Sequence, residues 1–591
     1  MSLTLREALQ NLTVPDLKDL MLHVPQAPTG TRKDELVEHI AHAMLGSQLK
    51  VIWSQLDAMQ SAAVAEAVHH PLGEYSSQRF SAKYQNVPAF EVAGSKTHRY
   101  SSGKKSALAL FIHFALKERC YFVPADLRAR LLEFVAPPPP VGLESSETPQ
   151  EGEGQFERST EREALQEVVV MLRTIEQERI VVSDKTALPA SSTLQLLGAK
   201  LVGGDFYPVV EKKDKWDQTI GPIKAFAWPM LLQAGALAVR SGTRLTLSPA
   251  GLKALSAPPA DVLRALWRKW LKTTLLDEFS RVDAIKGQGG AGRVMSAVAP
   301  RRAAIEQALR SCPVGRWVTL DDFSRFMRAS DLQFVVAHDP WKLYLCERQY
   351  GSLGYDGSHG WNILQDRYIW AVLLEYAATL GMIDVACLDP ADACDDFRSM
   401  WGADEMRFLS RYDGLCSFRL NALGAYVLGL RESYKPVAQP SNVGISVLPS
   451  LRVLVVRGTL SAQDALLLDQ WAEPVEEGCW LLDRQKSLAA IEKGHDIAAL
   501  KQFLQSHDEL PLPELVESFL QRCERDGGAL KTGASAVLIE CRDIETAAAV
   551  ATHQETSPLC LRAGPKTLVV RTELLSKFRE RLHVIGLGLL S

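Results

Sequence analysis

Three side chains that could perform hydrolytic chemistry lie within the stretch 205–213: the carboxylates of Asp205 and Glu211 and the amine of Lys213. Two carboxylates and a lysine can hold a divalent metal ion and orient water for attack on a phosphodiester. The surrounding sequence, GGDFYPVVEKKD, predicts a loop, and such sets arise by chance in a chain with 70 acidic and 66 basic residues. We therefore keep a divergent metal-dependent nuclease only as a third hypothesis, and we predict no catalytic residue and no metal site.

Two glycine-rich stretches resemble phosphate-binding loops but lack residues that such a loop requires. SSGKKSALALF (101–111) has Lys105 where the motif G-x-x-x-x-G-K-[ST] needs a hydroxyl, and IKGQGGAGRV (285–294) has neither lysine nor hydroxyl after its last glycine. The motifs H-E-x-x-H and C-x-x-C do not occur in the sequence. We therefore predict a chain without a cofactor, without a helicase motor and without enzymatic activity.

Two cations stand at the start of a predicted helix, where acids are more usual. In the segment 12–45 one helix ends near Val24, a Pro/Gly/Thr loop follows, and a second helix opens with Arg32 and Lys33. Because the N-terminus of a helix is already partly positive, two added cations predict a phosphate ligand. Lys18, on the preceding helix, belongs to the same predicted group of nucleic-acid contacts.

A second group of cations lies in the middle of the chain. The stretch 262–310 holds ten Lys/Arg against four Asp/Glu. Arg264, Arg268 and Lys272 recur at every fourth position, so they share one helix face and could follow nucleic-acid phosphates; the alternative is an ordinary solvated face. Arg240 and Arg244 flank a Ser-Gly-Thr turn between two predicted strands and place two further cations at a turn tip.

The composition limits the classes of protein to which the chain can belong. With 47% hydrophobic and 23% charged residues, its 591 residues can form several globular domains. The formal net charge of -4 excludes a uniformly basic coat, so nucleic-acid contacts must come from local patches. Ten scattered cysteines, no signal-peptide pattern and no long apolar run lead us to expect a soluble, reduced, cytoplasmic protein without membrane contact.

The secondary structure predicted along the chain begins with a mostly helical N-terminal part. Residues 136–163 follow it and combine four consecutive prolines with glycines, serines and glutamates, which predicts a disordered linker. Beyond this segment one pattern occurs twice, in 228–255 and in 373–430. Each copy predicts a helix, two strands, a polar cap residue and a short helix containing a glycine, as at the end of a winged helix. A generic helix-plus-hairpin domain is the alternative.

The segment 12–45 resembles a SAP motif, the helix-extension-helix unit of DNA-bound proteins. The matching positions are Leu17, Leu20, Gly30, Lys33, Leu36 and Ile40. Pro25 and Pro28 in the loop, and Asp34 and Glu35 beside Lys33, depart from that pattern. The resemblance implies contacts with DNA.

The C-terminal sequence from 448 to 520 is similar to the domain at the N-terminus of XPB-type repair helicases and in bacterial helicase-associated proteins. The match consists of a strand followed by a helix with Ser487 and Leu488, then Gly494, and a further helix that closes before Leu510-Pro511. The stretch 56–84 also resembles the helical N-terminal part of those bacterial proteins. The resemblance implies a role alongside a DNA helicase.

We thus predict a multidomain, helix-rich α+β protein that binds DNA as a non-catalytic adaptor, with a helicase or nuclease supplied in trans as its partner. DNA repair and defence against phage or other foreign DNA are both suitable settings. A protein-interaction scaffold that uses winged helices as docking surfaces is the alternative. The predicted parts are a SAP-like head (1–46), a helical domain (47–135), the linker (136–163), winged helix 1 (164–260), a basic helix with a Gly-rich connector (261–300), winged helix 2 (301–440) and an XPB N-terminal-like α+β domain (441–591).

Overall fold

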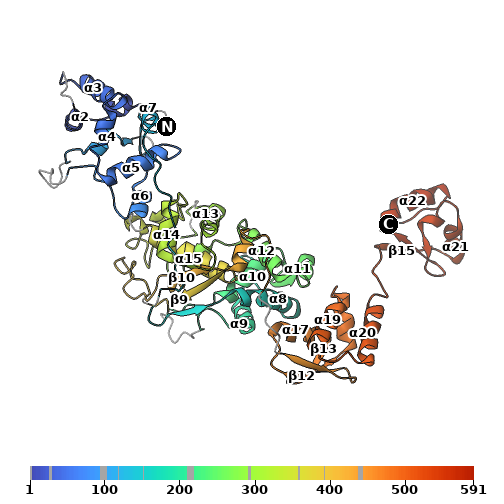
Figure 1. Cartoon of the computed structure of the whole chain (residues 1–591). Helices are drawn as coiled ribbons and strands as arrows, with labels where there is room; N and C mark the ends of the chain where they lie inside the picture. Colours follow the sequence, from blue (N-terminus) through green and yellow to red (C-terminus); the bar gives the residue numbers. More distant parts are fainter. Residues whose placement is uncertain are drawn as a thin grey trace. The chain divides into compact units, whose positions relative to one another are not determined.

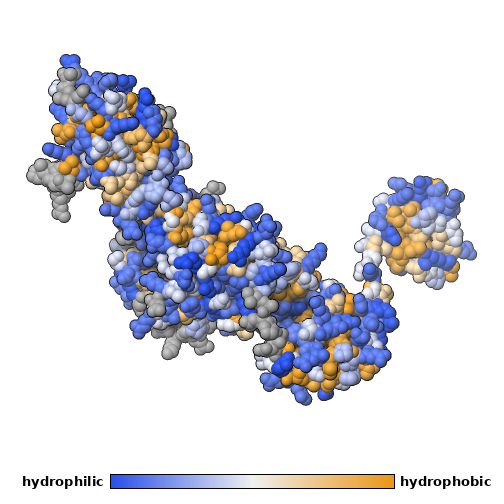
Figure 2. Space-filling view, viewed as in Figure 1, coloured by the Kyte–Doolittle hydropathy of each residue, from blue (hydrophilic) through white to orange (hydrophobic). Residues whose placement is uncertain are grey.

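The computed structural model shows a multidomain, helix-rich α+β protein that divides into two compact units, Met1–Gln439 and Pro440–Ser591 (Figure 1). None of the helices within its described residues is both long and apolar enough to span a bilayer. Hydrophilic residues cover most of the visible face of each part (Figure 2). The structure describes residues 3–25, 30–92, 103–116, 119–150, 152–208, 218–289, 294–356, 360–391, 393–436 and 443–590.

The N-terminal part forms one domain with a main hydrophobic core and a small second cluster of Ala8, Ala115 and Phe122. Leu17 and Ile40 of the predicted SAP-like segment share the main core with Leu108 and Leu131, so the predicted boundary at residue 46 does not separate two domains. A 34-residue helical pair cannot bury its apolar faces alone, and the following helices cover them. The elements are α1 (Leu5–Gln10), α2 (Val14–Met21), α3 (Lys33–Leu45), α4 (Leu49–Trp53), α5 (Ala58–His69), β1 (Glu74–Tyr75), α6 (Ser77–Tyr84), β2 (His113–Ala115), β3 (Cys120–Phe122) and α7 (Ala125–Leu131).

The predicted disordered linker, 136–163, is instead held to the central region at several points within its described residues. The backbone groups of Ser146 and Trp317 exchange two hydrogen bonds, and β4 (Phe156–Arg158) pairs antiparallel with a strand of the second half. Arg158 donates to Glu163 and to backbone carbonyls. The prediction was wrong because a segment without its own core can still be held by the free edge of an existing sheet.

The central region begins with a unit of helices and a three-stranded sheet, which we call the first repeat. Its antiparallel strands have the order β5-β7-β6, so the first strand pairs with the last. The elements are α8 (Glu161–Gln177), β5 (Ile180–Val181), α9 (Ser191–Lys200), α10 (Lys224–Ala234), β6 (Ala238–Ser241), β7 (Arg244–Leu247) and α11 (Pro249–Ala254). Helix α12 (Pro259–Trp270), predicted as part of a connector, instead packs against α8, α10 and α16 (Ala422–Val427).

The second repeat has the same order of elements. Its strands have the order β9-β10-β8, with β4 added at the β9 edge. The elements are α13 (Val298–Arg310), β8 (Trp317–Thr319), α14 (Leu320–Ala329), a continuous helical run comprising η5 (Trp361–Asp366), α15 (Arg367–Ala371) and η6 (Val372–Ala378), β9 (Ile383–Cys387), β10 (Leu415–Leu420) and α16 (Ala422–Val427).

The short helix after the hairpin is built identically in the two repeats. Ser248 caps α11 by accepting a hydrogen bond from the Gly251 amide, and Asn421 caps α16 by accepting one from Gly424. A Cβ at Gly251 would lie 2.1 Å from the Leu237 carbonyl oxygen, and one at Gly424 would lie 2.0 Å from that of Met382. The glycines therefore permit the same close backbone contact in both copies.

The second unit contains two separate hydrophobic cores rather than the one predicted for 441–591. One core belongs to 443–528 and includes Leu500, Leu504 and Phe519; the other belongs to 536–590. The elements of the first are β11 (Gly444–Val447), β12 (Arg452–Arg457), α17 (Ala462–Trp471), β13 (Ala472–Glu476), β14 (Cys479–Leu482), α18 (Arg484–Glu492), α19 (Ile497–His507) and α20 (Glu514–Gly527). Those of the second are β15 (Ala536–Glu540), α21 (Ile544–Thr552), β16 (Leu561–Arg562), β17 (Thr567–Arg571) and α22 (Leu575–Val584).

Candidate nucleic-acid interface

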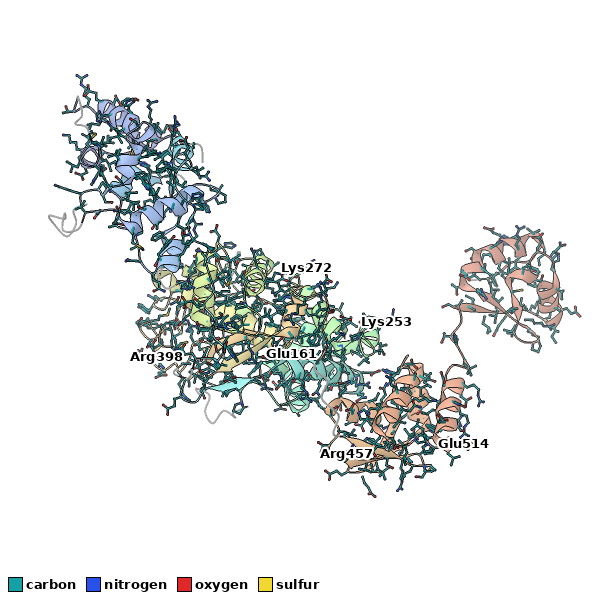
Figure 3. The ribbon with its side chains drawn as sticks, in the orientation of Figure 1. Glu161, Lys253, Lys272, Arg398, Arg457 and Glu514 are labelled. Atoms are coloured by element: carbon teal, nitrogen blue, oxygen red, sulfur yellow. The ribbon has the colours of Figure 1, made fainter. Side chains whose placement is uncertain are left out.

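The sequence from the hairpin of the first repeat to the end of α12 is rich in exposed cations that have no ion pair among the described residues. The stretch 238–272 contains seven Lys/Arg and a single acid, Asp261. Six of these cations are exposed and have no ion pair with any residue that the structure describes. Figure 3 shows two of them, Lys253 and Lys272, at the periphery of the central region. We call this group the basic strip: Arg240, Arg244, Lys253, Arg268, Lys269 and Lys272.

The hairpin places its two cations on either side of a tight turn. Ser241 pairs with Arg244, and Gly242 between them has a φ of 61°, which favours glycine. Because side chains alternate along a strand and Arg240 lies opposite Leu245, Arg240 and Arg244 lie on opposite faces of the hairpin. Arg240 also lies 3.4 Å from the Ser183 carbonyl oxygen, and both side chains are exposed. The predicted turn tip thus exists and presents positive charge on both faces.

Helix α12 exposes fewer phosphate-binding candidates than its sequence spacing predicts. The guanidinium of Arg264 lies 4.6 Å from the ring centroid of Tyr426, which holds it against α16. Lys272 lies beyond the end of the helix, whose C-cap is Leu271. Arg268 and Lys269 are exposed in the last turn, where cations also complement the helix dipole. Of the three predicted phosphate contacts on this helix, Arg268 and Lys272 are therefore exposed and Arg264 is not. Lys269, which was not predicted, is a further exposed cation.

Several of the basic residues in 262–310 form ion pairs inside the central region. Arg302 is fully buried, and its Nε donates to Glu278 at 2.5 Å. Arg301 forms a bidentate pair with Asp277, and Arg281 donates to the fully buried Glu375. Burial raises the pKa of Glu278, and the Arg302 charge opposes that rise. These arginines are neutralised by carboxylates of the same region, and Arg301 and Arg302 are too deeply buried to contact DNA.

The cations of the head differ in what surrounds them. Lys18 is exposed in the last turn of α2. Arg32 is the exposed N-cap of α3, but its backbone amide already donates to the Glu35 carboxylate at 3.0 Å. The predicted phosphate site at this helix start is thus partly occupied by the chain's own carboxylate. Lys33 is half-buried at the first position of the helix.

The carboxylate of Asp205 has a structural role. It accepts hydrogen bonds from the backbone amides of Ile223, Lys224 and Ala225, and so caps α10. Glu211 and Lys213, which would complete the predicted hydrolytic set, lie outside the described residues. With the Phe206 amide as a fourth donor, this carboxylate has little capacity left for a metal ion.

The third helix of each repeat is buried, which the sequence analysis did not predict. Every residue from Lys224 to Leu232 in α10 is buried, and so is every residue from Ile363 to Ala378 except Gln365. Helices α10 and η6 contact one another. The sequence AFAWPMLL in α10 is apolar on all faces, and this signal of a buried helix could have been recognised.

The sequence matches no known protein-family model and no curated protein.

Proposed function

We propose that this chain is a non-catalytic DNA-binding adaptor that holds the DNA backbone through its basic strip and works with a helicase or nuclease supplied in trans. The observation that carries this proposal is the group of six exposed cations that form no ion pair with any described residue, in a chain of net charge -4. Elsewhere in the central region, cations such as Lys224, Arg281 and Arg302 are neutralised by buried carboxylates. A cationic surface that the protein does not neutralise is suited to phosphates.

The order of elements in both repeats supports a tandem winged-helix architecture. In each repeat a helix and a strand precede two helices and a two-stranded hairpin, and the first strand pairs with the last. In winged helices the hairpin commonly contacts the DNA backbone or the minor groove. Arg240 and Arg244 occupy that position in the first repeat.

The burial of the third helices restricts how DNA can bind. In helix-turn-helix proteins the corresponding helix enters the major groove and reads base edges. Here α10 and the helical run 361–378 are occupied by packing contacts. We therefore infer backbone binding without sequence preference, with an affinity that falls as salt rises.

A protein-interaction scaffold is the second candidate, and the second repeat favours it. In the excursion between β9 and β10 (388–414), which corresponds to the basic turn of the first repeat, the exposed charges among the described residues are Asp389, Asp395, Asp404 and Glu405 against Arg398 and Arg407. Asp396 and Asp413 instead pair with the buried Arg367. An acidic excursion repels phosphates. The two candidates are compatible if the first repeat contacts DNA and the second contacts protein.

The proposal is tested by binding of the full chain to labelled single-stranded, duplex and forked DNA across a salt series. Arg240→Glu/Arg244→Glu and Arg268→Glu/Lys272→Glu should each raise the Kd about tenfold or more and reduce the salt dependence, because each removes two phosphate contacts. Lys577→Glu/Arg579→Glu makes the same charge change at two exposed residues of the second unit and serves as the control.

Equal weakening by all three variants would indicate a general effect of net charge and would contradict a specific role for the basic strip. Absence of binding to every DNA at low salt would overturn the proposed function.

A further inference from the structure

A pocket of about 700 Å³ opens in the central region beside the acidic excursion of the second repeat. Its wall includes Trp401, Asp404 and Glu405 from the excursion and Glu347 from the loop before η5. The other charged residues of the wall are Arg281, Asp283, Lys286 and Arg411. None of the predicted nucleic-acid contacts lines this pocket.

The rim of the pocket carries an exposed aromatic pair. Trp401 is 50% exposed and Tyr350 is 56% exposed, and their ring centroids lie 5.5 Å apart at an interplanar angle of 41°. Large aromatic side chains are enriched at binding interfaces, and the face of an indole attracts cations. Trp401 thus offers an accessible ring face next to a charged pocket.

The charges of the pocket leave an unbalanced negative field. Arg411 pairs with Asp283, and Arg281 pairs with the buried Glu375. Glu347, Asp404 and Glu405 are exposed and have no ion pair among the described residues. Lys286 is the remaining cation of the lining. Three carboxylates against one lysine favour a cationic ligand and disfavour DNA.

One hydrogen-bond donor in the pocket wall, the Nε of Arg411, has no acceptor among the described residues. Arg411 is 8% exposed. The Nε atom is enclosed by protein, and because a buried donor without an acceptor is costly, turning the guanidinium toward an oxygen atom supplied at this wall is favourable. A polypeptide can bring a backbone carbonyl together with a cationic side chain.

We propose that this pocket binds an arginine- or lysine-bearing peptide segment of a partner protein, with the cation over the Trp401 ring and beside Asp404 and Glu405. This inference rests on the adaptor role in the proposed function and specifies the chemistry of the partner. It assigns DNA to the basic strip of the first repeat and protein to the second repeat.

The test uses the full chain and a fluorescein-labelled peptide of alternating glycine and arginine, followed by anisotropy at low salt. The same peptide with citrulline in place of arginine keeps the shape but lacks the charge. Asp404→Asn/Glu405→Gln should raise the Kd for the arginine peptide about tenfold, and Trp401→Ala should raise it about threefold to fivefold. Trp401→Phe keeps an aromatic face and should retain part of the affinity.

Matched controls change the same residue types elsewhere. Trp341→Ala removes another exposed tryptophan that does not line the pocket, and Glu514→Gln/Glu524→Gln removes two exposed carboxylates of the second unit. Both should leave the Kd within about twofold of the unmodified chain. Equal binding by the citrulline peptide, or equal loss in the control variants, would overturn the inference.

Every variant is also measured with DNA, which separates the two proposals. Loss of peptide binding in the pocket variants with unchanged DNA binding supports the inference. Failure of the arginine peptide to bind a chain that still binds DNA overturns this inference alone. Failure of DNA to bind while the peptide binds at the pocket overturns the proposed DNA contact alone.

Discussion

At the scale of single residues, Arg302 shows why a positive charge in the sequence does not identify a DNA contact. Its guanidinium donates to Glu278 and to the carbonyl oxygens of Trp270, Thr273 and Leu276. Glu278 also accepts a hydrogen bond from the Tyr368 hydroxyl. Arg302 therefore joins α13, the end of α12 and the helical run of the second repeat through one buried group.

We expect Arg302→Leu to destabilise the central region by about 3–5 kcal/mol, because it leaves the Glu278 carboxylate and three carbonyls buried without their donor. Urea unfolding followed by tryptophan fluorescence measures this loss. Arg310→Leu is the control, since Arg310 lies on the same helix with its side chain 47% exposed, and should cost less than about 1 kcal/mol. Similar midpoints for the two variants would contradict the structural role of Arg302.

At the scale of elements, the two repeats share a backbone contact that only glycine permits. In each repeat the helix after the hairpin starts at a polar cap, and its glycine lies against the carbonyl of a residue just before the second strand. The contact fixes the hairpin relative to the helix that follows it. In the first repeat it thereby supports the turn that carries Arg240 and Arg244.

Gly251→Ala and Gly424→Ala should each destabilise the central region by about 2 kcal/mol or more, because the added Cβ would overlap a backbone oxygen that cannot move without disturbing a strand. Gly198→Ala in α9 is the control. Its Cβ would lie 3.9 Å from the nearest atom, the Cβ of Ala225, so the higher helix propensity of alanine should leave stability unchanged or slightly raised. Thermal unfolding of the three variants distinguishes these outcomes, and equal effects would show that the contact is unimportant.

At the scale of the whole molecule, the two units have their own hydrophobic cores. The core of 443–528 contains Leu504 and Phe519, whereas residues such as Leu172 of α8 are buried in the first unit. Units with separate cores open separately, because the burial that stabilises one does not depend on the other.

Leu504→Ala should therefore destabilise 443–528 by about 2–5 kcal/mol without affecting the first unit. Hydrogen exchange followed by mass spectrometry should show faster exchange in β11, β12 and α19 and unchanged exchange in α8 and α10. Leu172→Ala should give the opposite pattern. Faster exchange throughout the chain in either variant would show that the units unfold together.

The sequence by itself predicted the elements whose signals are local. The Gly242 turn between two strands, the polar caps Ser248 and Asn421, and the repetition of one helix-hairpin-helix pattern depend on neighbouring residues, so they could be recognised without a fold. The exposed cations Arg240, Arg244 and Arg268 could be named for the same reason.

The tertiary structure alone decided which of these features face solvent. It buried the helical run from Ile363 to Ala378, placed Arg264 on Tyr426 and Arg302 on Glu278, and brought Trp401 and Tyr350 together across 51 positions of sequence. It also joined 1–46 with 47–135 in one core and held 136–163 at a sheet edge. These outcomes depend on contacts between residues far apart in the chain, and the charge or hydropathy of a segment does not specify which distant partner it meets.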